Sequence, residues 1–201
     1  MSSLLMRLNM ATRQWHADID DAWLQLLTPS VERADYVAQL VRTYGFVAPF
    51  ESACKYTPAL NQYVDFRQLL RAGLIAQDLL TLGLSASQVA SVQTCASITM
   101  FQDVDEALGW LYVVERATLL QDGIRRHLLA HLPEIESACA YLTAFDGRVN
   151  EHWESFGRTL DEAAVSPGAA DRMITAAQTG FECIRGWFQH HRSAELSIAF
   201  S

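Results

Sequence analysis

Glycine and proline are scarce in this chain of 201 residues, which holds 10 glycines and five prolines. No stretch shows the strict alternation of apolar and polar residues that is typical of a half-buried strand. Internal repeats and low-complexity tracts are also missing. Apolar residues recur instead at three- and four-residue steps, which indicates amphipathic helices. We therefore expect an all-α protein in which residues 1–201 form a single domain.

Basic residues are also fewer than acidic residues. The formal net charge is -8 at pH 7 and the sequence pI is about 5.1. This acidic balance argues against nucleic acid or an anionic membrane surface as the main partner. Charges interrupt the apolar runs well short of a membrane span, and the N-terminus lacks the apolar core and the cleavage site of a signal peptide. We expect a cytoplasmic protein that has no contact with a membrane.

The cysteines do not form any of the usual short motifs. They stand at positions 54, 95, 139 and 183, too far apart in the sequence for a zinc knuckle or a CxxC redox pair. Small and apolar neighbours around them are typical of helix interiors. We therefore expect reduced thiols in the core.

Proline, glycine and capping residues divide the chain into seven or eight predicted helices. One of these starts is Ser85-x-x-Gln88, which resembles a capping box. Pro49 is expected to kink or stop the second helix, and residues 193–201 are expected to form a flexible tail. This number of helices exceeds that of a plain four-helix bundle and is compatible with a bulky ligand held between helices. The predicted helices cover residues 3–27, a second segment from Pro29 to Pro49, and residues 66–82, 85–94, 103–131, a segment beginning at Pro133, 151–164 and 169–191.

His16 is the candidate metal ligand of the first helix. Asp20 follows one turn later, so its carboxylate is placed to accept a hydrogen bond from one imidazole nitrogen and leave the other free for a metal. By spacing alone, a packed or surface histidine is the commoner interpretation.

The other histidines and the usual catalytic motifs give weaker indications of a functional site than His16 does. His127 and His131 have a spacing that can hold zinc, but they stand at a helix C-terminus, where capping by cations is the better interpretation. His190 and His191 form a similar terminal pair. The sequence contains no Glu-x-x-His pair, Gly-rich phosphate loop or G-x-S-x-G elbow, so di-iron, nucleotide and serine-hydrolase chemistry are not indicated.

Several segments, taken in order, resemble the bacterial haem oxygenases that produce biliverdin. The run LNMATRQWH (residues 8–16) is similar to the family's L-x-x-A-T-R-x-x-H motif. Trp153, Phe156, Phe181 and Trp187 stand where the closing helices of the family carry aromatic residues. The further similar segments are YVAQLVRTYGFVAPFE (residues 36–51), DLLTLG (78–83) and ALGWLYVVE (107–115).

The resemblance implies a haem-oxygenase-like multi-helical fold and cleavage of haem to biliverdin, carbon monoxide and ferrous iron. Oxygen and an external electron donor, such as a ferredoxin or a reductase, would be needed. His16 would be the axial ligand of the haem iron, with Asp20 as its partner. Tyr112 would approach a haem propionate.

The chain departs from the family in the helix that faces the other side of haem. The family continues there as G-x-T-L-G-G-Q, whereas this chain has RATLLQDG (residues 116–123). Glycine allows close backbone approach because it has no Cβ, so the side chains at these positions would occupy space that haem and oxygen need. An alternative is therefore a non-catalytic relative that binds haem or another tetrapyrrole, and a third is a helical interaction domain. The residues expected to face the ligand from this helix are Arg116, Ala117, Leu120 and Gln121.

Overall fold

The structure is a computed structural model, and it describes residues 2–191, apart from the side chains of residues 68 and 69. Within that range all regular secondary structure is helical, which confirms the predicted all-α class. No helix in these residues combines the length and the apolar character needed to cross a membrane. The tail predicted for residues 193–201 lies outside the described residues. The elements are α1 (Ser3–Leu24), α2 (Arg33–Tyr56), η1 (Leu60–Gln62), α3 (Phe66–Leu69), α4 (Ala72–Thr81), α5 (Ala86–Ala90), α6 (Val104–Arg116), α7 (Thr118–His131), η2 (Pro133–Ala138), α8 (Val149–Ala163) and α9 (Ala169–His190).

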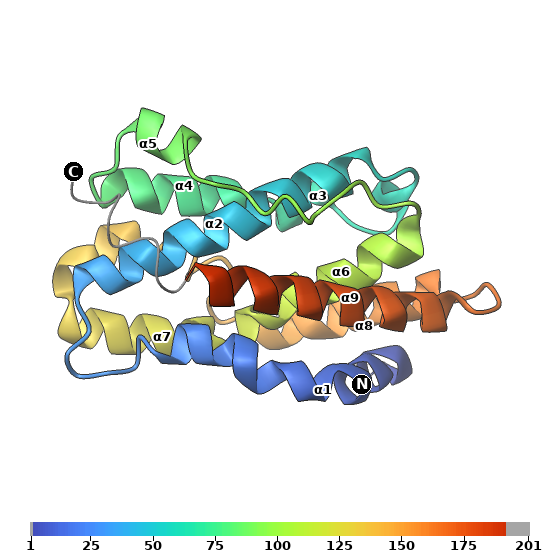
Figure 1. Ribbon diagram of the computed structural model, residues 1–201. Coiled ribbons are helices and arrows are strands. Elements are labelled where there is room, and N and C mark those ends of the chain that lie inside the picture. The colour runs from blue at the N-terminus through green and yellow to red at the C-terminus, as the bar shows by residue number, and fades with distance from the viewer. Residues whose placement is uncertain (1, 192–201) are drawn as a thin grey trace.

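Helices α6 and α9 form the most extensive helix pair and cross the middle of the molecule (Figure 1). Gly109 of α6 permits their close approach, because a Cβ there would lie 2.3 Å from the carbonyl oxygen of Met173 in α9. Gly180 acts in the same way from α9, since its Cβ would lie 2.9 Å from a side-chain carbon of Val113. The helix propensity lost at Gly109, about 1 kcal/mol relative to alanine, is thus exchanged for closer helix packing.

Helix α1 packs on α9 and α8, whereas α2 packs mainly on α4 (Figure 1). The apolar stripe predicted for α1 is buried along most of its length and turns toward α9. Its fully buried members are Leu4, Leu8, Thr12, Trp15, Ile19, Ala22 and Trp23. His16 lies at the edge of this stripe, so the packing of α1 fixes the direction in which the histidine points.

Helix α2 continues through Pro49, so of the expected kink or stop, the stop does not occur. Proline has no backbone N–H, so the carbonyl of Gly45, four residues earlier, loses its helical donor. The N–H of Cys95 replaces that donor and reaches the Gly45 oxygen at 2.8 Å. Cys95 belongs to residues 91–103, the segment between α5 and α6 that we call the strap, which runs along α2 (Figure 1). The strap therefore supplies the hydrogen bond to Gly45 that the proline removes from α2.

Two predicted helices are divided. The segment 66–82 forms α3 and α4, because the Glu51 carboxylate accepts hydrogen bonds from the backbone N–H groups of Arg71 and Ala72, the latter at 2.8 Å. These bonds cap the start of α4 as an N-cap side chain does. The capping box predicted at Ser85 and Gln88 is confirmed, although α5 ends four residues earlier than expected, at Ala90.

The segment 103–131 is also divided, into α6 and α7 with a break at Ala117. The N–H of Ala117 donates to the Val114 carbonyl at 3.3 Å, a bond of the tighter 3-10 type. On the other side of the break, the Trp153 indole N–H donates to the Thr118 hydroxyl at 3.0 Å and fixes the start of α7. The residues that follow the break therefore lie on a different helix from Arg116.

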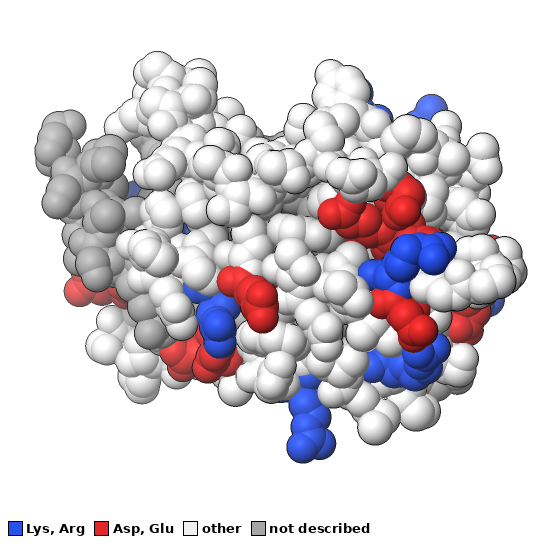
Figure 2. Space-filling model, turned by 45° about the vertical axis from the view of Figure 1, so that its right-hand side comes forward, with Lys and Arg blue, Asp and Glu red and all other residues white. Residues whose placement is uncertain are grey.

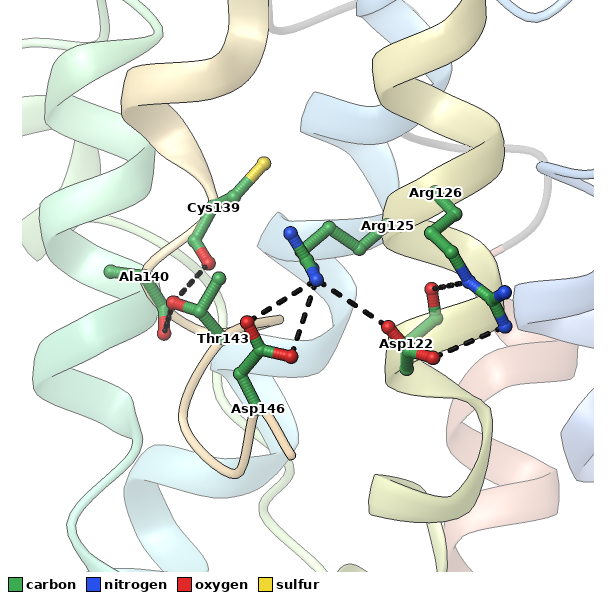
Figure 3. A network of polar contacts seen from close by, with 7 residues as sticks. All are labelled: Asp122, Arg125, Arg126, Cys139, Ala140, Thr143 and Asp146. Atoms are coloured by element: carbon green, nitrogen blue, oxygen red, sulfur yellow. Dashed lines mark hydrogen bonds and ion pairs between the residues drawn. The ribbon is translucent and has the colours of Figure 1, made fainter. Parts of the chain in front are cut away.

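The segment between η2 and α8 is held against α7 by Arg125 (Figure 3). Its guanidinium reaches Asp122 at 3.4 Å and Asp146 at 3.3 Å. At the start of this segment, the Thr143 hydroxyl donates to a backbone carbonyl at 2.9 Å. These contacts support Tyr141, whose ring stacks on Trp23 of α1 with the centroids 5.8 Å apart.

Acidic and basic side chains lie next to one another on the face drawn in Figure 2. Among the surface pairs of the described residues, Arg172 donates to Asp105 at 2.9 Å, and Arg7 donates to Asp171 at 2.7 Å. These pairs join the first turns of α9 to α6 and to α1. The exposed Arg7–Asp171 pair adds little stability, at most about 1 kcal/mol, whereas the Asp105 carboxylate of the other pair is largely buried.

Candidate ligand-binding site

His16 is half-buried on α1 and faces α9. Its imidazole packs tilted against the Phe181 ring, with the centroids 5.4 Å apart. Its Nε2 lies 3.0 Å from the Thr12 hydroxyl oxygen, and that hydroxyl donates to the Leu8 carbonyl at 2.7 Å. Because the hydroxyl proton is already used, Nε2 is the nitrogen that donates. A metal at Nε2 would therefore require the bond to Thr12 to break.

The protonation of His16 is controlled by its surroundings. Burial lowers its pKa, the nearby Arg116 guanidinium lowers it further, and Asp20 opposes both, so that the pKa falls from 6.5 to about 4. The imidazole is therefore neutral at neutral pH. Neutral imidazole is the form that coordinates iron and other transition metals.

Asp20 pairs with Arg116 and not with His16, which differs from the expected hydrogen bond. Both guanidinium Nη atoms of Arg116 donate to the Asp20 carboxylate, one of them at 2.8 Å, and both side chains are largely buried. A bidentate guanidinium is a stronger partner for a carboxylate than a neutral imidazole. Arg116 is also the last residue of α6, an end of the helix that favours a cation.

A cavity of about 30 Å³ lies beside this ion pair, between α1, α2, α6 and α9. Arg116, Ala117 and Leu120 all contribute to its wall, together with apolar and aromatic residues. Its volume corresponds to about one water molecule. Sites for small molecules measure roughly 300–1,000 Å³, so this cavity does not hold a tetrapyrrole.

A groove of about 960 Å³ lies between α1, the α6–α7 junction and α8. Two aromatic rings, Tyr112 and Trp153, meet edge to face along it, with the centroids 6.1 Å apart. Arg116 and Arg158 bring positive charge to it, and Glu154 and Asp161 bring negative charge. Its size and its aromatic surface suit a large planar ligand. The groove is lined by Ser2, Leu5, Met6, Asn9, Tyr112, Arg116, Leu119, Asn150, Trp153, Glu154, Arg158 and Asp161.

Arg116 lines both the groove and the small cavity, whereas His16 lines neither. Arg116 is therefore the side chain that the groove and the cavity share. Coordination of a haem iron through Nε2 of His16 would require both the bond to Thr12 and the pair of Arg116 with Asp20 to open. Of the two spaces, the groove has the room that a haem needs.

The remaining predicted site residues lie on both sides of the α6–α7 break. Tyr112 is buried, and burial raises the pKa of its hydroxyl although Thr12 and Asn9 lie close enough to lower it. Gln121 is buried near Tyr141 and lines neither the cavity nor the groove. Gln121 is therefore the one predicted site residue that lies apart from the others. The residues that the structure brings together are His16, Asp20, Tyr112, Arg116, Ala117 and Leu120.

A buried ionic cluster beside Arg116 is a feature that the sequence analysis missed. The Arg71 guanidinium donates to both oxygens of Glu115 at 2.6 and 2.7 Å, and His152 contacts the same carboxylate. Burial would raise the pKa of Glu115, but the charge of Arg71 and the hydrogen bond from His152 hold it below the usual value. The cluster fixes the last turn of α6, and with it the position of Arg116. Nothing in the spacing of residues 71, 115 and 152 signals this contact.

No group of three or more His, Cys, Asp or Glu side chains among residues 2–191 is arranged to hold a metal ion. The His127 and His131 rings stack with their centroids 4.2 Å apart. His127 bonds the Thr28 carbonyl at 3.0 Å, and His131 bonds the His127 carbonyl at 2.9 Å. The second bond occupies a carbonyl in the last turn of α7, as expected for a capping histidine.

The comparisons with known proteins agree with this architecture. The haem oxygenase family model matches residues 2–190. The fold is similar to that of the haem oxygenase from Neisseria meningitidis, solved with NO and CO bound, with a TM-score of 0.68 and 19% sequence identity over 95% of this chain and 92% of that chain. No curated protein matches the sequence. The predicted haem-oxygenase-like fold is confirmed, and the chain belongs to the haem oxygenase family.

Proposed function

We propose that the protein binds haem in the groove between α1, the α6–α7 junction and α8, and that His16 coordinates the iron once Arg116 leaves Asp20. The position of Arg116 carries this proposal, because it lines both the groove and the cavity near the histidine. His16 is neutral at neutral pH, with a pKa of about 4, as a haem ligand must be. Membership of the haem oxygenase family supports haem as the ligand.

The groove offers one further guanidinium for a haem propionate. Haem carries two propionates, and Arg158 lines the groove together with Glu154 and Asp161. A guanidinium binds a carboxylate in a fixed bidentate geometry. Displacement of Arg116 would leave the largely buried Asp20 carboxylate without this partner, so the opening of the site has a cost.

A titration with hemin tests the proposal. The wild type is expected to develop a Soret band at stoichiometric hemin, and His16→Ala is expected to shift or lose it. His131→Ala is the matched control, because His131 is an exposed histidine at the end of α7, and it should behave as the wild type. A wild type without any Soret change would contradict haem binding, and identical spectra for wild type and His16→Ala would contradict axial ligation.

The proposed reaction is the oxidative cleavage of haem to biliverdin, carbon monoxide and ferrous iron. It uses oxygen and electrons from an external donor, a ferredoxin or a reductase, and we place it in the cytoplasm. When bound, the haem supplies the oxygen chemistry, and the protein supplies the ligand, the polarity and the access. Turnover is measured by adding ascorbate or a ferredoxin system and recording the absorption of the bilin product. A stable haem spectrum under these conditions would favour binding without turnover.

Binding without turnover is the second candidate, and the side chains in place of glycines favour it. Leu120 occupies the cavity wall next to Arg116. Leu120→Gly, made together with Gln121→Gly at the buried position next to it, should tighten haem binding or raise turnover if Leu120 obstructs the site. Arg126→Gly combined with Ala130→Gly is the control, since both positions are exposed in the same helix. Equal affinity and rate in the two double variants would contradict obstruction.

A further inference from the structure

Two cysteines that are 88 residues apart in the sequence meet in the folded chain. The Sγ atoms of Cys95 and Cys183 lie 3.7 Å apart. Cys95 belongs to the strap and is 5% exposed, whereas Cys183 lies on α9 and is half-buried. The contact depends on the tertiary fold, because nothing in the local sequence brings these residues together.

The backbone on both sides fixes the two sulfur atoms. The Cys95 N–H is bonded to the Gly45 carbonyl at 2.8 Å, the acceptor that Pro49 leaves open in α2. A Cβ on Gly45 would lie 2.4 Å from the carbonyl oxygen of Gln93, so the strap follows α2 in direct contact. Cys183 stands inside the long helix α9. The thiols are thus preorganised with respect to each other.

The two thiols differ in their readiness to ionise. The hydrogen bond from Cys183 and the backbone N–H groups of Ser97 and Ile98 lower the pKa of Cys95 to about 6, against the opposing effect of burial. The contact with Cys95 raises the pKa of Cys183. Near neutral pH the pair therefore contains one thiolate and one thiol, the combination used in thiol oxidation and disulfide exchange.

The other cysteines lack both features. Burial raises the pKa of the Cys54 thiol and that of the Cys139 thiol. Cys139 donates to the Ile135 carbonyl at 3.4 Å within its own segment. Both are buried. They provide internal controls in the same chain.

We propose that Cys95 and Cys183 are a redox-active dithiol that forms an intramolecular disulfide when the protein meets a peroxide. The Cys95 thiolate attacks one oxygen of hydrogen peroxide, the O–O bond breaks, and the departing hydroxide takes a proton to become water. The Cys183 sulfur then attacks the resulting sulfenic sulfur, and the sulfenic hydroxyl leaves as water with the Cys183 proton. The peroxide is reduced to water, and the two thiols are oxidised to one disulfide.

The disulfide would connect the strap to α9 close to the candidate site. Cys183 follows Phe181 by two positions on α9, and Phe181 packs on His16. Oxidation would therefore restrain the wall of the site through α9. This inference does not depend on haem, and it holds or fails separately from the proposed function.

Peptide mapping of the full chain tests the inference. The wild type is treated with hydrogen peroxide, its remaining thiols are alkylated, and it is digested with trypsin without reduction. The expected product is the peptide of residues 72–116, which contains Cys95, linked to the peptide of residues 173–185, which contains Cys183. The mass of the intact protein should fall by the two thiol hydrogens, and dithiothreitol should restore it. Cys54→Ser and Cys139→Ser should give the same linked peptide, whereas Cys95→Ser and Cys183→Ser should not.

If a cysteine variant does not fold, the digest of the wild-type protein alone tests the inference. Four alkylated cysteines after peroxide treatment of the folded protein would overturn the inference. So would a sulfinic acid at Cys95 or Cys183 without the linked peptide, or a disulfide that forms only between two chains. A linked peptide that involves Cys54 or Cys139 as often as Cys183 would overturn it too, because it would show oxidation of unfolded protein.

Discussion

The two walls of the candidate site differ in how they are built. On one side, α1 is a continuous helix that presents a neutral His16. On the other side, α6 and α7 are separated by a break at Ala117, and Arg116 reaches across from there to Asp20 on α1. The wall on α1 thus presents a neutral histidine, while Arg116 of the opposite wall pairs with Asp20, one turn away on the same helix. A family motif in one wall therefore does not guarantee that a ligand can reach it.

The walls also differ in what fixes them. His16 depends on the apolar packing of α1 against α9. Arg116 depends on the buried cluster of Arg71, Glu115 and His152, which holds the last turn of α6. Packing of a helix stripe follows from sequence periodicity. A buried ion pair between distant residues does not, and it determines where the obstructing side chain lies.

Arg71→Met is expected to have the largest effect on stability. Arg71 and Glu115 are 2% and 1% exposed, and removal of one partner leaves a buried charge without compensation, which costs about 3–5 kcal/mol. Arg126→Met is the control, because the Arg126–Asp122 pair is 73% and 50% exposed and should change stability by at most about 0.5 kcal/mol. Urea unfolding measures both. Equal losses in the two variants would contradict the assigned role of the cluster.

Gly109→Ala and Gly123→Ala are expected to shift stability in opposite directions. A Cβ at Gly109 meets the backbone of α9 at 2.3 Å, and overpacking of this kind costs about 1–3 kcal/mol. A Cβ at Gly123 has nothing within 4 Å, so the gain in helix propensity should stabilise α7 by up to about 1 kcal/mol. Thermal unfolding of the two variants gives the signs. A neutral Gly109→Ala would show that α6 and α9 are not in the close contact described.

The pH dependence of stability should show a smaller effect of His16. Its pKa is about 4 in the folded protein and 6.5 in the unfolded reference, so the unfolded chain binds the additional proton between these values. Stability should therefore rise with pH across that window and be unaffected by this group above it. His16→Gln should flatten the rise, and the exposed His131→Gln should leave it unchanged. An NMR titration that gives His16 its ordinary pKa would contradict the account.

The sequence predicted the parts of the fold that depend on local pattern. Helix periodicity located α1, α8 and α9 within a few residues, and the capping box at Ser85 began α5 as expected. The family motif pointed to His16, although its role as a ligand stays a prediction. These features lie within single helices, where the spacing of residues sets which side chains share a face.

Features that depend on distant residues could not be predicted in this way. Pro49 was expected to kink or stop α2, but the helix continues because Cys95 supplies the missing donor from the strap. Asp20 was assigned to His16, but a stronger partner reaches it from α6. The cysteines showed no motif, although Cys95 and Cys183 are in contact. In each case the partner is far away in the sequence, and its position is set by helix packing.

The affinity for hemin of Arg116→Gly relative to Arg126→Gly tests the central claim most directly. Both changes place glycine in the α6–α7 region, so they carry a similar cost in helix propensity. Arg116, however, lines the groove and pairs with Asp20, one turn from His16, while Arg126 is exposed on α7. We predict that Arg116→Gly binds hemin at least about tenfold more tightly than the wild type, a difference of about 1.4 kcal/mol, with a Soret band that His16→Ala abolishes. The control should match the wild type. Unchanged or weaker binding in Arg116→Gly would contradict the claim that Arg116 closes the route to His16.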